Sequence, residues 1–145
     1  MCQTATVPPS APWQPLEVLG LALIAVTAIV PIDQLESLHW YHYPGEQPLI
    51  EITLAEGETV GAYLPDEDIC LEYGPADTIC TVFDSLQQDL PHQRQFWGQA
   101  LPGCRPGHPH PARIRAAGSA VELYCPADQE SIRLLVTLPE AQSPV

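Results

Sequence analysis

Hydrophobic and polar residues divide the chain into one long apolar segment and a following region of short alternating patterns. The apolar segment covers residues 16–32, LEVLGLALIAVTAIVPI, and contains a single charged residue, Glu17. As an α-helix it would extend about 25 Å, which is the lower limit for crossing the hydrocarbon core of a bilayer. We therefore predict a transmembrane helix over residues 16–32.

Two features favour a membrane helix that is retained in the mature protein. Aromatic residues, which prefer the headgroup layer, lie beyond both ends of the segment: Trp13, Trp40, Tyr41 and Tyr43. Small residues inside it allow a second helix to approach closely in lipid: Gly20, Ala22, Ala25 and Ala28. A cleaved signal peptide and a helix buried in a protein core are the alternatives, although the preceding tail lacks the basic residues of a signal peptide.

The segments that flank the apolar stretch are predicted to be a tail and a surface helix. Residues 1–15 contain four prolines and no charged side chain, which is typical of a flexible tail. Residues 33–43 can form a juxtamembrane helix, because Asp33 and Glu36 have the spacing of a capping box. The apolar face of this helix would consist of three residues: Ile32, Leu35 and Leu38.

Residues 44–138 are an acidic region in which the hydrophobic period changes to two, the period of a β-strand. Turn-forming residues separate seven short segments, and residues 139–145 follow as a disordered tail. The predicted strands are residues 49–54, 59–64, 68–73, 77–83, 112–117, 120–125 and 131–138. This pattern predicts a mostly β fold: a small antiparallel β-sandwich or open barrel of about seven strands, preceded by one apolar helix.

The charge of the chain limits the choice of partners. Eighteen carboxylates face five arginines and no lysine, for a net charge of −13. Nucleic acid is therefore excluded as a partner, because phosphate binding requires clustered cations. The densest acidic cluster consists of Asp66, Glu67, Asp68, Glu72 and Asp77. We expect it to be either a solvated edge or a surface that docks a basic protein.

Four cysteines lie in the acidic region: Cys70, Cys80, Cys104 and Cys125. An even number of cysteines in a small domain beyond an apolar segment favours two disulfides. Of the three possible pairings we prefer 70–80 and 104–125, because Cys70 and Cys80 would face each other across one predicted hairpin. Disulfides would place the C-terminal domain on the exported side of the membrane, in the periplasm, a lumen or the extracellular space. Free buried thiols are the alternative.

A metal site is a rival use of the same cysteines. The chain has no C-x-x-C pair, which is the strong signature of zinc sites. The segment CRPGHPHP nevertheless places Cys104 near His108 and His110, and Cys125 can complete the set. Alternating histidines can point at one metal, whereas solvated histidines in a Pro-rich loop are the simpler interpretation.

Catalytic motifs are absent from the sequence. It contains neither a Gly-rich phosphate loop nor G-x-S-x-G, so we predict no enzyme and no organic cofactor. The first functional hypothesis is a single-pass, membrane-anchored accessory or docking subunit, which joins integral membrane protein subunits in a larger assembly. The alternative is a secreted or soluble β-sandwich binding module that binds a metal through its Cys/His loop.

Overall fold

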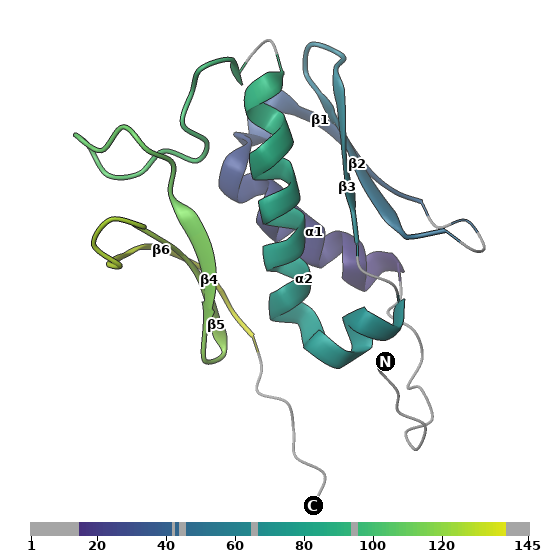
Figure 1. Cartoon of the computed structure of the whole chain (residues 1–145). Helices are drawn as coiled ribbons and strands as arrows, with labels where there is room; N and C mark the ends of the chain where they lie inside the picture. Colours follow the sequence, from purple (N-terminus) through teal and green to yellow (C-terminus); the bar gives the residue numbers. More distant parts are fainter. Residues whose placement is uncertain (1–14, 42, 44–45, 65–66, 94–95, 139–145) are drawn as a thin grey trace, which may run out of the picture.

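Two helices and two small sheets make up the part of the chain that the structure describes. The structure is a computed structural model and describes residues 15–41, 43, 46–64, 67–93 and 96–138, without the side chains of residues 15–18 and 67–73. The elements are α1 (Pro15–Ile29), η1 (Ile32–Gln34), β1 (Leu35–Tyr41), β2 (Leu49–Leu54), β3 (Thr59–Tyr63), α2 (Glu67–Asp89), η2 (Leu90–His92), β4 (Arg113–Ala117), β5 (Ala120–Tyr124) and β6 (Ser131–Thr137). The helices α1 and α2 lie between the two sheets (Figure 1).

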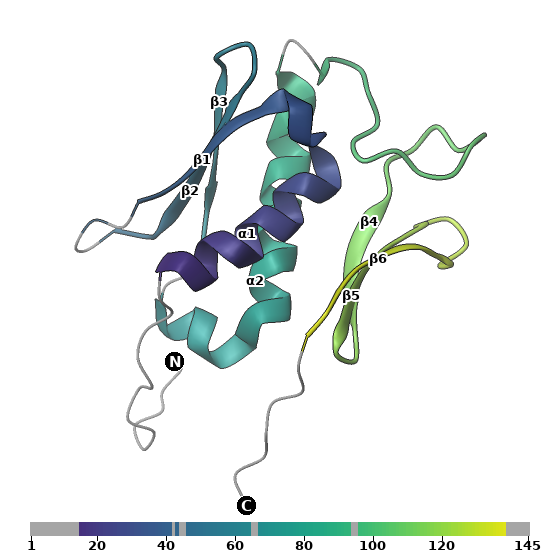
Figure 2. The same cartoon turned by 180° about the vertical axis from the view of Figure 1, so that it is seen from behind.

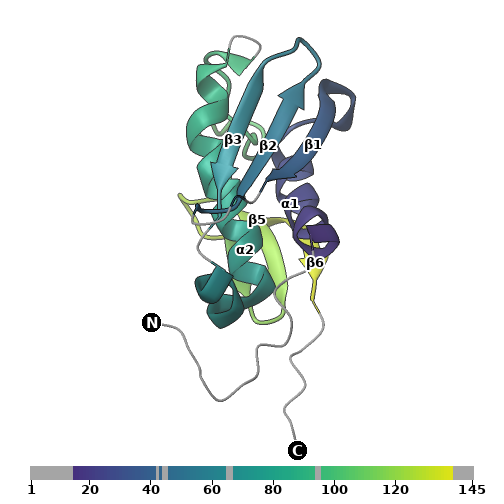
Figure 3. The same ribbon diagram turned by 90° about the vertical axis from the view of Figure 1, so that its right-hand side faces the viewer.

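Both sheets are antiparallel and three-stranded, in the orders β1-β2-β3 and β4-β5-β6. Alternate residues of each sheet point into the core, as Ile50 and Ile52 do on β2 and Val121 and Leu123 do on β5. The first sheet is seen face-on in Figure 3. The described residues thus form an α and β fold, and the predicted sandwich or barrel of seven strands is not confirmed.

The core lies where α1 crosses α2, which is clearest from behind (Figure 2). Ala25 and Val26 of α1 are completely buried, as are Val82 and Phe83 of α2. Small alanine side chains let the two helices approach closely, so the larger side chains of α2 fill the space between the sheets.

The predicted transmembrane helix is not supported. The helix α1 has fifteen residues, which is about 22 Å at the usual rise per residue and shorter than a bilayer core. Among the described residues, no helix is both long and apolar enough to cross a membrane. The prediction of a single-pass membrane location, with its exported C-terminal side, is corrected accordingly. Of the predicted membrane-packing strip, Ala22, Ala25 and Ala28 are buried in the chain's own core, whereas Gly20 is exposed.

The predicted helix over residues 33–43 is also wrong, because residues 35–41 form β1. A register shift between Leu35 and Ser37 in the pairing with β2 marks a bulge. A bulge adds one residue to the strand, so Leu35 and Leu38 both pack against the core although three positions separate them. That spacing imitates one helical turn and produced the wrong prediction.

Residues 68–83 form part of α2 and not the predicted pair of strands. Gly74 and Pro75, which were interpreted as a hairpin turn, instead produce a kink inside the helix. Gly74 has φ 83°, a conformation that favours glycine, and Pro75 begins the second helical part, where its missing N–H is tolerated. The core face follows helical spacing, with Ile79, Val82, Phe83 and Leu86 all buried.

The remaining β predictions are confirmed. Residues 49–54 and 59–63 pair as the hairpin β2–β3, and residues 113–117 and 120–124 pair as β4–β5. Gly118 begins the two-residue turn of the second hairpin with φ 64°, as such turns require. The last predicted strand is β6, which pairs with β5.

Two substitutions in α1 test whether its small residues serve this core. Ala25→Leu should lower the free energy of unfolding by about 1–3 kcal/mol, because Ala25 is completely buried and the core has no space for the added atoms. Gly20→Ala should raise it by about 0.5–1 kcal/mol, because an added Cβ meets nothing within 4 Å and alanine favours the helix. Urea unfolding of both variants measures these changes, and equal effects at the two sites would contradict the packing described.

Candidate metal centre

A tight turn brings the first two candidate ligands together. The backbone N–H of His108 donates to the carbonyl of Arg105 over 3.0 Å, and Gly107 has φ 85°. Pro106 and Gly107 therefore occupy the central positions that these residues favour in a type II turn. The turn reverses the chain between Cys104 and His108, and the Cys104 Sγ lies 3.6 Å from the His108 Nδ1.

The alternating prolines place the second histidine beside the first. Pro109 and Pro111 each hold the preceding residue in an extended conformation, so His108 and His110, two positions apart, can direct their rings to the same side. The ring centroids lie 5.3 Å apart. The local sequence alone thus accounts for the meeting of three candidate ligands.

The base of this loop is attached to α2. The backbone N–H of Ala112 donates to the carbonyl of Pro102 over 2.9 Å, and Gly103 and Pro111 form an isolated bridge. The side-chain amide of Gln87 donates to the Leu101 carbonyl over 3.1 Å and to the Ala112 carbonyl over 2.7 Å. One side chain of α2 therefore holds both ends of the loop, which limits how far its candidate ligands can move.

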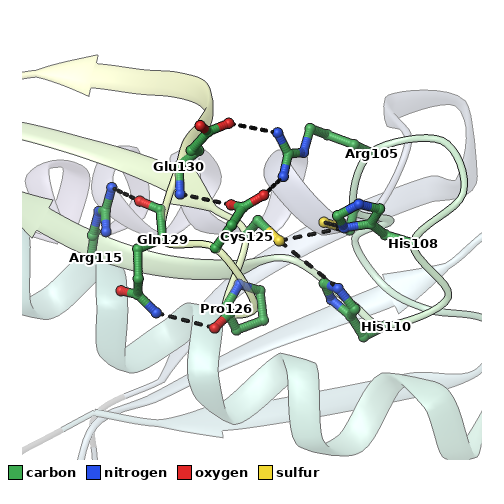
Figure 4. A network of polar contacts seen from close by, with 10 residues as sticks. Arg105, His108, His110, Arg115, Cys125, Pro126, Gln129 and Glu130 are labelled. Carbon is green, nitrogen blue, oxygen red and sulfur yellow. Dashed lines mark hydrogen bonds and ion pairs between the residues drawn. The ribbon is translucent and has the colours of Figure 1, made fainter.

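The fourth candidate ligand comes from the turn that joins β5 to β6. Cys125 follows the last residue of β5 and is completely buried. Its N–H donates to the Glu130 carbonyl over 2.9 Å, and its carbonyl accepts from the Gln129 N–H over 2.7 Å. These bonds fix the backbone of Cys125, and Figure 4 shows its sulfur directed at His108 and His110.

The four ligand atoms have the separations of a tetrahedral site. The Cys125 Sγ lies 3.5 Å from the His108 Nδ1 and 3.9 Å from the His110 Nε2. All four atoms, including the Cys104 Sγ, lie within 4.8 Å of one another. A tetrahedron with metal–ligand bonds of about 2.0–2.3 Å has edges of about 3.3–3.8 Å. Side-chain shifts of up to about 1 Å would therefore place one ion at bonding distance from all four, with the sulfurs slightly farther from it than the nitrogens.

The hydrogen bond of His110 orients its ring for this role. Its Nδ1 lies 3.2 Å from the carbonyl oxygen of Pro111, which can only accept a hydrogen bond. A neutral ring would therefore carry its proton on Nδ1, which leaves the Nε2 lone pair directed at the Cys125 sulfur and available to a metal. Backbone carbonyls commonly hold metal-binding histidines in this way.

The Cys125 thiol is surrounded by groups that favour its ionised form. Burial raises the pKa of Cys125, but the backbone N–H of Ala127 and the side chains of Cys104, His108 and Arg105 outweigh burial and lower it to about 7. A thiolate, which is the form that binds metal, is therefore accessible near neutral pH.

Arg105 joins the loop to the β5–β6 turn. Its Nη1 donates to the Glu130 Oε2 over 2.8 Å, and its Nη2 pairs with the Asp128 carboxylate. The Asp128 side chain also accepts the Glu130 N–H over 2.9 Å. These contacts connect the two segments that carry the candidate ligands.

The predicted disulfides are not formed. Cys80, Cys104 and Cys125 are all free thiols. Residues 70 and 80 lie on α2 on either side of the kink, so the facing strands assumed for their pairing do not exist; the Cys70 side chain is outside the described set. Burial, then Asp84 and Asp77, raise the pKa of Cys80 to about 11, so this thiol stays protonated at neutral pH.

The predicted acidic docking surface falls mostly outside the described side chains. Asp66 is not described, and only the backbone is described for Glu67, Asp68 and Glu72. Asp77 is exposed on α2. Docking of a basic protein at this cluster stays a prediction.

Sequence reasoning missed the residues around the ligands. Arg105, Asp128 and Glu130 meet across more than twenty positions, and Gln87 reaches the loop from α2. No pattern in the sequence pairs such distant polar residues. The nearest signal is the segment CPAD beginning at Cys125, whose proline starts a tight turn directly after the cysteine.

The comparisons with known proteins give no match: no family model, no curated protein and no solved structure resembles the chain. Its function must therefore be argued from the residues of this site.

Peptide mapping tests the state of the cysteines. Protein that is purified without oxygen, unfolded with a chelator and alkylated without reductant should carry the alkyl group on Cys80, Cys104 and Cys125, because the structure has these thiols free. A peptide in which a disulfide joins any two of them would contradict this assignment.

Proposed function

We propose that this chain is a zinc-binding protein and that zinc cross-links its loop 101–111 to its β5–β6 turn. The observation that carries the proposal is the convergence of one ligand atom each from Cys104, His108, His110 and Cys125 within 4.8 Å. The proposal develops the alternative sequence hypothesis, a binding module with a Cys/His metal loop.

The ligand types favour zinc over other ions. Two thiolates and two imidazoles form the Cys₂His₂ set of structural zinc sites, and calcium or magnesium would require oxygen ligands. With both histidines neutral, two thiolates balance the two charges of the ion. A neutral centre is well suited to Cys125, whose side chain is removed from water.

The arrangement supports a structural role for the metal. Four protein ligands fill a tetrahedral ion and leave no position for a substrate or a reactive water. The loop 101–111 has little regular secondary structure, whereas Cys125 adjoins the sheet β4-β5-β6. A metal bond between them would hold the shape of the loop, which is the function of a structural site in a binding module.

The proposal predicts one zinc ion per chain. Native mass spectrometry and elemental analysis of the full chain should find one equivalent, which a chelator removes. Cys125→Ser should lose the ion because it removes a buried thiolate ligand. Cys80→Ser is the matched control and should keep it, because Cys80 is on α2 outside the cluster. Absence of zinc from the unsubstituted chain after incubation with zinc, or full retention in Cys125→Ser, would overturn the proposal.

Arg105 should raise the zinc affinity of the site although it is not a ligand of the ion. Arg105→Gln removes the charge beside Cys125 and the links to Asp128 and Glu130, so zinc affinity should fall by about 10–100-fold. Arg133→Gln removes the same charge from β6 and should leave the affinity unchanged. Competition with a chromogenic chelator measures both dissociation constants, and equal values would show that Arg105 does not position the site.

A further inference from the structure

We propose that Cys104 and Cys125 are a redox-active pair: a peroxide oxidises them to a disulfide, and the bound zinc is released. This inference rests on the zinc site proposed above and assigns it a regulated state. Hydrogen peroxide is the oxidant considered, because it accepts two electrons and is small enough to enter a half-buried site.

The two sulfurs are already close. Both Sγ atoms belong to the set within 4.8 Å and lie 3.6 and 3.5 Å from the same His108 nitrogen. A disulfide bond is about 2.05 Å long, so the sulfurs must approach by less than about 3 Å. Cys104 lies outside every helix and strand, between the two loop ends that Gln87 holds, so an approach of this size needs only a local change at Cys104.

The exposure of the two sulfurs indicates the order of events. Cys104 is half-buried and Cys125 is completely buried, so peroxide reaches Cys104 first. The Cys104 thiolate attacks one peroxide oxygen, the O–O bond breaks, and a sulfenic acid forms while the other oxygen leaves as water after taking up a proton. The Cys125 thiolate then attacks the Cys104 sulfur, and the sulfenic oxygen leaves as a second water with a second proton. Two thiolates lose two electrons, and the peroxide gains them.

Loss of zinc follows from the loss of both anionic ligands. A disulfide sulfur is neutral and binds zinc poorly, so only His108 and His110 would remain, and two neutral imidazoles do not hold the ion in water. A reductant of the dithiol class restores both thiols and with them the site. The centre would thus exist in a reduced, zinc-bound form and an oxidised, metal-free form.

The fold is suited to this exchange because the two segments stay joined in either form. The ion pairs of Arg105 with Asp128 and Glu130 connect the loop to the turn without the metal. Gln87 holds the loop base on α2. Oxidation therefore replaces a metal cross-link with a covalent one between the same two segments, and it frees the two histidine rings.

The experiment uses the full chain loaded with zinc and treated with hydrogen peroxide in steps. A chromogenic zinc chelator follows release, and peptide mapping without reductant identifies the disulfide. We expect one equivalent of zinc released for each disulfide between Cys104 and Cys125, and recovery of binding after dithiothreitol. Cys80→Ser should behave like the unsubstituted chain, because that thiol is not part of the pair.

Two further samples separate this inference from the proposed zinc function. The metal-free chain should form the same disulfide with peroxide, and Cys104→Ser should not form it, with Cys125 then recovered as a free thiol or oxidised alone. The redox inference is overturned if zinc stays bound under peroxide, or if zinc is released without a disulfide between Cys104 and Cys125. Neither result contradicts the proposal that the chain binds zinc. A chain that never binds zinc overturns the proposed function. In that case the disulfide between Cys104 and Cys125 is still measured in the metal-free chain.

Discussion

The packing of α1 against α2 is the contact on which the other parts of the structure depend. A three-stranded sheet is only marginally stable until one of its faces is covered. Here the helix pair covers one face of each sheet (Figure 1), and Phe83 of α2 is completely buried. Ala25 of α1 is completely buried, and so small a side chain suits a close contact between the two helices.

The candidate metal centre depends on the same helices through a single residue. Gln87 extends from α2 to the carbonyls of Leu101 and Ala112, which are the two ends of the loop. Between these two ends the chain has little regular secondary structure. The candidate ligands thus occupy a segment whose ends are held on α2 and whose middle the proposed zinc ion would cross-link.

Sequence patterns correctly predicted the strands that pair with the next strand along the chain. The hairpin of β2 and β3 and the hairpin of β4 and β5 follow from a period of two and from turn residues. The apolar segment at residues 16–32 was recognised as apolar throughout, but hydrophobicity does not distinguish lipid from a protein core as the surroundings. At α2, residues 77–83 contain many β-branched side chains, and the glycine and proline before them fit a hairpin turn and a helix kink equally well.

At the candidate site, too, residues close together in the sequence could be grouped from the sequence, whereas contacts between distant residues could not be predicted. Cys104, His108 and His110 were named together as candidate ligands because they lie within seven residues and the two histidines alternate. The position of Cys125 opposite them depends on how the second sheet packs. The contacts of Arg105 depend on it as well, so they could not be predicted from the sequence.

The predicted disulfide between Cys104 and Cys125 is wrong, although the two sulfurs do lie close together. A disulfide and a metal site both require two sulfurs in close contact, so the sequence argument for proximity could not choose between them. The choice follows from the groups around the sulfurs: His108 lies within 3.6 Å of both, and His110 faces Cys125. Two imidazoles take no part in a disulfide, whereas they can serve as ligands of a metal ion. The same proximity also allows a disulfide to form when an oxidant is present. In the redox inference proposed for this site, the two interpretations describe two states of it.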